Sequence, residues 1–120
     1  MADTVPPVPE ISVQSLGARL RSEDPFILLD VRELWELESA RITDPRVAVA
    51  PMSTLAERGL RGLPAAAQSQ QAEIFVLCHH GIRSAQVAAW LLARGWNRAF
   101  SVAGGIEDYA VKVDPSVGRY

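Results

Sequence analysis

Short runs of consecutive apolar residues limit most strongly what this chain can fold into. The sequence has FILLDV at residues 26–31, VAVA at 47–50, IFVL at 74–77 and a weaker run, AFSV, at 99–102. A strand covered by helices on both faces is apolar at successive positions, whereas a strand with one face in water alternates between apolar and polar residues. The runs therefore predict buried strands of a mainly parallel sheet.

Helical patterns separate these runs. Val87 and Leu91 have the spacing of two residues on one face of a helix, and Gly95 shortly afterwards is a typical helix stop. Near the N-terminus, Ser12 is expected to cap a helix that ends at about Leu20. Strands that alternate with helices predict an α/β fold.

The chain is expected to form one domain with a short tail at each end. Its 120 residues contain no repeat and no change of composition, and 48% of them are hydrophobic, enough for a core without disulfides or metals. Pro6, Pro7 and Pro9 predict an extended tail over residues 1–10. The domain is then expected at residues 11–113, and residues 114–120 form a second tail, laid on the surface or left loose.

Charge and hydropathy exclude several classes of protein. The net charge is -2, which predicts no nucleic-acid partner and no binding to anionic membranes. No apolar run approaches the roughly 20 residues that span a bilayer, and the N-terminal MADTVPPVPE does not have the pattern of a secretory signal. The single cysteine suits a reducing compartment. A cytoplasmic location is therefore expected.

The stretch FVLCHHGIRSAQV, at residues 75–87, contains the only cysteine and both histidines. Cys78 follows the apolar run 74–77, at the strand end where open α/β sheets hold their ligands, and the next helix is expected to begin near Ser84 as its cap. Gly81 permits a tight loop from His79 to Arg83, whose N–H groups would form a nest around the sulfur. The nest, the helix N-terminus and the Arg83 guanidinium would all stabilise an anionic sulfur, as a thiolate or a persulfide.

Other interpretations of the same residues stay open. A lone buried cysteine is often only a small apolar core residue. Cys78, His79 and His80 are adjacent and cannot easily converge on one ion, so neither a metal nor another cofactor is predicted. Each histidine either faces solvent or tunes the sulfur by titrating near neutral pH. Arg83 is either a surface cation or turns toward the sulfur.

Three motifs in the same order resemble those of the rhodanese-like sulfurtransferases. CHHGIRS at residues 78–84 resembles the active-site loop of that family, Cys-x-x-Gly-x-Arg-Ser. DVRE at 30–33, with Glu36 after it, is similar to the Asp-Val-Arg-Glu signature, and GGIEDY at 104–109 is similar to Gly-Gly-Ile-x-x-Trp, with Tyr109 in place of tryptophan. The resemblance runs from about residue 11 to residue 113. It fails at residues 41–44, RITD, where the family has a His-Ile-Pro-Gly turn.

The resemblance implies a rhodanese-like α/β fold, with a five-stranded, mainly parallel sheet flanked by helices on both faces. Cys78 would be the catalytic nucleophile. Asp30 and Arg32 would lie near it as supporting charges, more as a structural pair than as catalytic groups. The substrate-binding loop would consist of the six residues after the cysteine: His79, His80, Gly81, Ile82, Arg83 and Ser84.

The resemblance also implies sulfur transfer. Cys78 would accept sulfane sulfur from a small donor such as thiosulfate, forming a persulfide, and pass it to cyanide, a thiol or a protein acceptor, in a monomer or weak dimer. Two alternatives remain. One is a cysteine-dependent phosphatase or arsenate reductase, although the spacing from Cys78 to Arg83 is one residue shorter than in such phosphate-type loops. The other is a non-catalytic interaction module of rhodanese fold, against which the intact Cys78 and Arg83 count.

Overall fold

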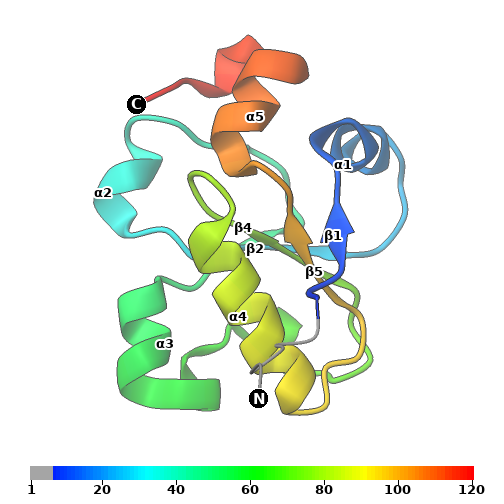
Figure 1. Ribbon diagram of the computed structural model, residues 1–120, viewed down its shortest axis with the longest axis vertical. Helices are drawn as coiled ribbons and strands as arrows, with labels where there is room; N and C mark the ends of the chain where they lie inside the picture. The colour runs from blue at the N-terminus through cyan, green and yellow to red at the C-terminus, as the bar shows by residue number, and fades with distance from the viewer. Residues whose placement is uncertain (1–6) are drawn as a thin grey trace, which may run out of the picture.

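A parallel five-stranded sheet lies between two layers of helices in the computed structural model, which describes residues 7–120 (Figure 1). The strand order is β1-β5-β4-β2-β3, and every neighbouring pair is parallel. This confirms the predicted α/β class, and each of the four apolar runs contains one strand. The strands are β1 (Glu10–Ile11), β2 (Ile27–Asp30), β3 (Val47–Val49), β4 (Ile74–Leu77) and β5 (Ala99–Val102).

Helices α1 and α5 cover one face of the sheet, and α3 and α4 cover the other (Figure 1). Successive residues of β2 therefore enter different cores: Leu28 packs with the α1 side and Leu29 with the α3 side, and both are fully buried. This double burial is the reason that the strands read as continuous apolar runs. The helices are α1 (Val13–Leu20), α2 (Leu34–Leu37), α3 (Met52–Arg58), α4 (Ile82–Ala93) and α5 (Gly105–Lys112), with single 3₁₀ turns at Gly59–Gly62, Ala65–Ala67 and Pro115–Val117.

The helix ends follow local sequence signals, with one correction. Ser12 caps α1 as predicted, because its Oγ accepts a hydrogen bond from the Ser15 N–H at 3.0 Å. Gly95, with φ +99°, follows the end of α4. The prediction that Ser84 caps α4 is wrong: the helix begins two residues earlier, at Ile82, after Gly81 at φ +103°. Glycine tolerates this left-handed conformation, so the chain turns into the helix earlier and draws Ser84 into the first turn.

The first and last of the described residues pack on the domain. Residues 1–6 of the predicted N-terminal tail lie outside the described residues, but Glu10 starts β1, and the Pro9 carbonyl accepts a hydrogen bond from the Ser101 N–H at 2.9 Å. The sheet therefore begins inside the segment expected to be a tail. Residues 114–120 lie on the surface and end beside α2 (Figure 1), where Tyr120 bonds to Glu36.

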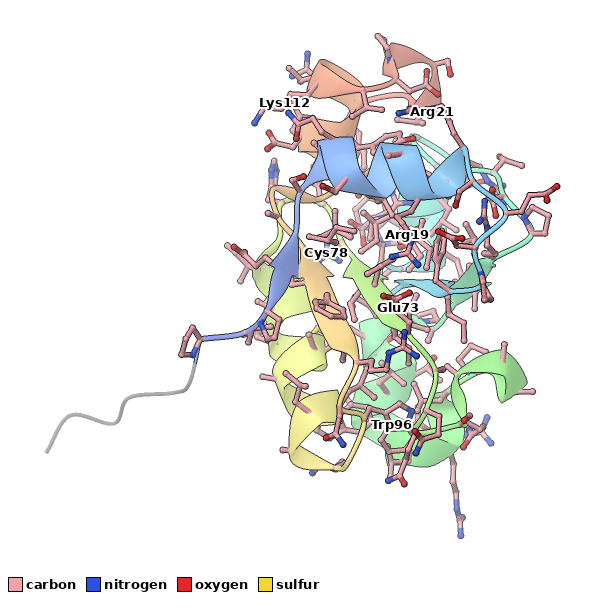
Figure 2. All side chains as sticks on the ribbon, turned by 90° about the vertical axis from the view of Figure 1, so that its right-hand side faces the viewer. Arg19, Arg21, Glu73, Cys78, Trp96 and Lys112 are labelled. Atoms are coloured by element: carbon pink, nitrogen blue, oxygen red, sulfur yellow. The ribbon has the colours of Figure 1, made fainter. Side chains whose placement is uncertain are left out.

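Residues 41–44, which depart from the family pattern, lead from α2 toward β3. Their path is held by Arg46, which pairs with Asp44 at 2.9 Å and donates at 2.8 Å to the carbonyl of Leu20, the last residue of α1. A second ion pair on this side joins Arg19 of α1 to Glu73 before β4 (Figure 2). None of the helices in residues 7–120 has the length and apolar character required to cross a bilayer.

Candidate active site

Cys78 is the first residue after β4, at the carboxyl end of the strand (Figure 2). Its side chain lies on the α4 face of the sheet, in the same core as Val76, and the residue is only 1% exposed. β4 pairs with β2 in a register that sets Leu77 opposite Asp30. The cysteine loop and the DVRE segment thus leave the sheet side by side, as expected for two parallel neighbours.

The sulfur of Cys78 has three hydrogen-bond partners. The backbone N–H groups of Gly81 and Ser84 donate to Sγ at 3.0 and 3.2 Å, and the thiol donates to the Ser84 hydroxyl oxygen at 3.3 Å. The same hydroxyl is 2.8 Å from the hydroxyl of Ser101 on β5. Donors from the start of a helix stabilise negative charge on sulfur. Ser84, expected as a helix cap, is instead part of this sulfur cradle.

The glycine pair of the third motif supports the loop from behind. The Ile106 N–H donates to the Cys78 carbonyl at 2.9 Å, and the Glu107 N–H donates to the His79 carbonyl at 3.1 Å. Gly105, at φ +63°, lets the chain come this close, because a Cβ there would overlap the carbonyl groups of both loop residues. The motif thus anchors the loop that follows Cys78 to the N-terminus of α5.

Arg83 is held by a carboxylate. Its two Nη groups donate to the two oxygens of Glu36 at 2.7 and 2.8 Å, a bidentate pair. Glu36 is 3% exposed and also accepts hydrogen bonds from the Glu33 N–H and the Tyr120 hydroxyl, both at 2.8 Å. The hydrogen bonds from Arg83 outweigh burial and lower the pKa of Glu36 to about 2. The carboxylate is therefore ionised at neutral pH, and both ends of the guanidinium fork are occupied.

Asp30 and Arg32 form the predicted charge pair at the end of β2. Arg32 is fully buried, and its Nη2 and Nε atoms donate to the two Asp30 oxygens at 2.7 and 3.0 Å. Its Nη1 donates to the Ala40 carbonyl at 2.8 Å and to the Tyr120 hydroxyl at 3.2 Å. Among residues 7–120, neither member of the pair bonds to Cys78. The pair braces the wall beside the site.

The two histidines differ in their surroundings. His79 is half-buried, with its ring stacked on Tyr120 at 3.8 Å between centroids and on the exposed His80 at 3.9 Å. Burial, with the charge of His80 as the next cause, lowers the pKa of His79. Its imidazole is therefore uncharged at neutral pH.

A cavity of about 260 Å³ leads to the sulfur and is lined by Cys78, His79, His80, Ile82 and Arg83. Gly81 and Ser84 contribute their N–H groups to the sulfur instead of lining this cavity. Two groups at the site had not been predicted to contact it, Glu36 and Tyr120. Glu36 stood in a motif that pointed to this region, whereas nothing in the sequence pointed to Tyr120. Within residues 7–120 there is no cluster of three or more histidine, cysteine or acidic side chains that could hold a metal ion.

Comparison with known proteins places this chain in a family. Residues 12–112 match the family of the Rhodanese-like domain, so the chain belongs to the rhodanese-like domain proteins. A protein of Allochromatium vinosum named sulfurtransferase is 29% identical over 103 residues, which cover 86% of this chain and 89% of that protein. This chain, which has one buried cysteine at the end of β4, thus has a relative named for sulfur transfer.

Other relatives are longer than this chain. The putative sulfur carrier protein YrkF of Bacillus subtilis is 30% identical over 107 residues, 89% of this chain but 54% of that protein. A chloroplastic Rhodanese-like/PpiC domain-containing protein of Arabidopsis thaliana is 36% identical over 120 residues, 95% of this chain but 38% of that protein. This chain therefore spans about half or less of the length of these two relatives.

Solved structures agree with the fold. A rhodanese-like domain protein from Staphylococcus aureus superimposes with a TM-score of 0.69 at 26% identity, over 84% of this chain and 90% of that one. A human single-domain sulfurtransferase superimposes with a TM-score of 0.68 at 24% identity, over 87% of this chain and 96% of that one. At that identity the human structure supports the likeness in fold alone.

Proposed function

We propose that this protein is a sulfurtransferase whose Cys78 accepts sulfane sulfur from a thiosulfate-type donor and carries it as a persulfide. The sulfur then passes to cyanide, a thiol or a protein acceptor. The observation that carries the proposal is the pair of N–H groups, from Gly81 and Ser84, aimed at Sγ at the end of a cavity. A persulfide anion formed on Cys78 needs such donors, since buried negative charge without them is costly.

The proposed reaction needs no oxidant. The Cys78 thiolate attacks the outer sulfur of the donor, and an S–S bond forms while the S–S bond of the donor breaks. With thiosulfate the leaving group is sulfite, which takes the electron pair of that bond. The acceptor nucleophile then attacks the outer sulfur of the persulfide, and Cys78 leaves as a thiolate again. The Ser84 hydroxyl, 3.3 Å from Sγ, can rotate to donate to the thiolate in both steps.

The alternative chemistry, phosphate or arsenate transfer, has less support. An arginine that serves a phosphoryl group uses its fork on the oxygens of that group. Here both Nη atoms of Arg83 already donate to Glu36, and within residues 7–120 only two backbone N–H groups reach the sulfur. The donors around an intact Cys78 also argue for catalysis over a purely binding role.

Mass spectrometry of the intact protein tests the proposal. Mixing with thiosulfate in the absence of reductant should add the mass of one sulfur atom, which cyanide or dithiothreitol removes. Cys78→Ser is the control and should not gain this mass, because a serine hydroxyl is a much weaker nucleophile. Turnover of p-nitrophenyl phosphate that depends on Cys78, with no persulfide from any sulfane donor, would replace sulfur transfer by phosphatase chemistry.

A further inference from the structure

The charges beside Cys78 bear on which sulfur donor fits the site. We propose that Glu36 makes the site select against dianionic donors, including thiosulfate itself, and favour donors with at most one negative charge, such as organic thiosulfonates or persulfides. This inference rests on the proposed sulfur transfer and specifies its donor class. Thiosulfate then remains a usable but poor donor.

The first step of the argument is the charge of the cavity wall. Among the described residues that line the cavity, Arg83 is the only arginine or lysine. Glu36 is buried, ionised at neutral pH and bound to both Nη groups of Arg83. The pair is therefore neutral as a unit. Once Cys78 is a thiolate, the three groups together carry one net negative charge.

The second step concerns the remaining ionisable groups near the cavity. His79 is uncharged at neutral pH, because burial lowers its pKa. Behind the histidines, Glu107 lies near His79 but is paired with Arg119. His80 is exposed to water at the outer edge, where its field is screened by solvent and salt. Within residues 7–120, each buried cation near the cavity is therefore already paired with a carboxylate. None of them is available to neutralise a dianionic donor.

The third step is the chemistry of the donors. Thiosulfate and methanethiosulfonate transfer the same sulfane sulfur by the same exchange, and release sulfite and methanesulfinate respectively. They differ by one negative charge. An organic persulfide transfers its outer sulfur and leaves as a thiol, which keeps the proton. If one extra charge is taken to lie roughly 8 Å away, with an effective dielectric constant of about 40, Coulomb's law gives an extra repulsion on the order of fivefold in rate.

Glu36→Gln tests this assignment through a ratio of donors. For each protein, the kcat/KM for methanethiosulfonate is divided by the kcat/KM for thiosulfate. This ratio is then divided by the ratio of the rate constants with which the same two donors react with a free thiol in solution. The wild-type ratio should exceed one, and Glu36→Gln should lower it on the order of fivefold. Any loss of rate common to both donors cancels in the ratio. Glu38→Gln, on an exposed residue just beyond α2, removes the same charge and should leave the ratio unchanged.

A measurement on the unmodified protein gives a second test that does not depend on the variant folding. Salt screens repulsion, so kcat/KM for thiosulfate should rise with ionic strength, and rise more steeply than that for methanethiosulfonate. A fall with salt, or an unchanged ratio in a folded Glu36→Gln variant, would overturn the inference and leave sulfur transfer standing. If neither donor forms a persulfide on Cys78, the proposed function itself fails, and the inference with it.

Discussion

The ion pair between Glu36 and Arg83 makes a quantitative prediction about stability. The perturbation is Glu36→Gln, which keeps the shape of the side chain and removes its charge. In the folded protein the carboxylate accepts four hydrogen bonds, two of them from Arg83. Glutamine offers one oxygen where there were two, and leaves the guanidinium without a counter-charge. The variant is therefore expected to fold but to be less stable at neutral pH.

The size of the loss follows from the pKa of Glu36, which is lowered from 4.5 to about 2. Such a difference between the folded and unfolded states corresponds to about 3 kcal/mol of stability at pH 7. The Glu36 side chain is 4% exposed, but that of Arg83 is 32% exposed, so solvent screening reduces the expected loss to about 2–3 kcal/mol. A typical domain of this size is stable by roughly 5–15 kcal/mol, so the variant remains folded.

The pH dependence distinguishes charge from packing. Because the folded-state pKa of Glu36 is depressed, its contribution is complete above the unfolded value of 4.5 and is lost as the pH falls toward 2. Urea unfolding at pH 7 and pH 3 should therefore show a gap between wild type and variant that shrinks from about 2–3 to about 1 kcal/mol. Other carboxylates with lowered pKa values, such as Asp44, weaken both proteins equally and cancel.

Glu38→Gln is the matched control, an exposed carboxylate in the same segment whose loss should change the free energy of unfolding by less than about 0.5 kcal/mol. A gap of the same size at pH 7 and pH 3 would refute the reasoning, because it would assign the loss to packing. A gap of zero at pH 7 would mean that the ion pair contributes nothing net.

Three further predictions follow from the contacts around the loop. Gly105→Ala should lower the melting temperature and the rate of persulfide formation, because Gly105 has φ +63° and an added Cβ would overlap the His79 carbonyl. Thermal unfolding should show a loss of stability of about 1–3 kcal/mol. Arg83→Lys should keep the fold, seen by circular dichroism, but lower kcat/KM about tenfold, since an ammonium cannot reproduce the bidentate bond to Glu36 that positions the loop. Tyr120→Phe should cost about 1–2 kcal/mol in urea unfolding, because it removes the hydrogen bonds to Glu36 and from Arg32 but keeps the stack on His79, whereas Tyr120→Ala should cost more. Wild-type values in any of these variants would contradict the corresponding contact.

The sequence by itself was enough for the fold class and for the position of the candidate nucleophile. Strands buried on both faces leave continuous apolar runs, so β2, β3, β4 and β5 could be predicted from composition along the chain. Cys78 at the end of one run could be predicted to lie at the candidate site, because strand ends in parallel sheets meet at one edge. The helix cap at Ser12 could be predicted because it depends only on residues close in sequence, and the hydrogen bond from the Ser15 N–H confirms it.

Other features carried no such signal. β1 is an edge strand of two residues, Glu10 and Ile11, and is too short to leave an apolar run, so the boundary expected between tail and domain falls inside it. The start of α4 depended on Gly81 in a left-handed conformation, which the amino-acid type permits but does not require. A cap at Ser84 was locally as reasonable, and the packing of Ser84 against Cys78 and Ser101 decided between the two.

The tertiary structure alone decided the charge of the site. Arg83 could be predicted to matter, but its partner Glu36 is 47 residues away along the chain, and Tyr120 is 84 residues from Glu36. Contacts between residues so far apart in the sequence form because the chain brings β2, β4 and the C-terminal segment together. A periodic sequence pattern indicates only whether a residue faces water or the core, so it does not predict such partners. Whether the guanidinium fork is free for a donor or bound to a carboxylate is therefore a property of the folded chain, and the donor preference proposed here depends on it.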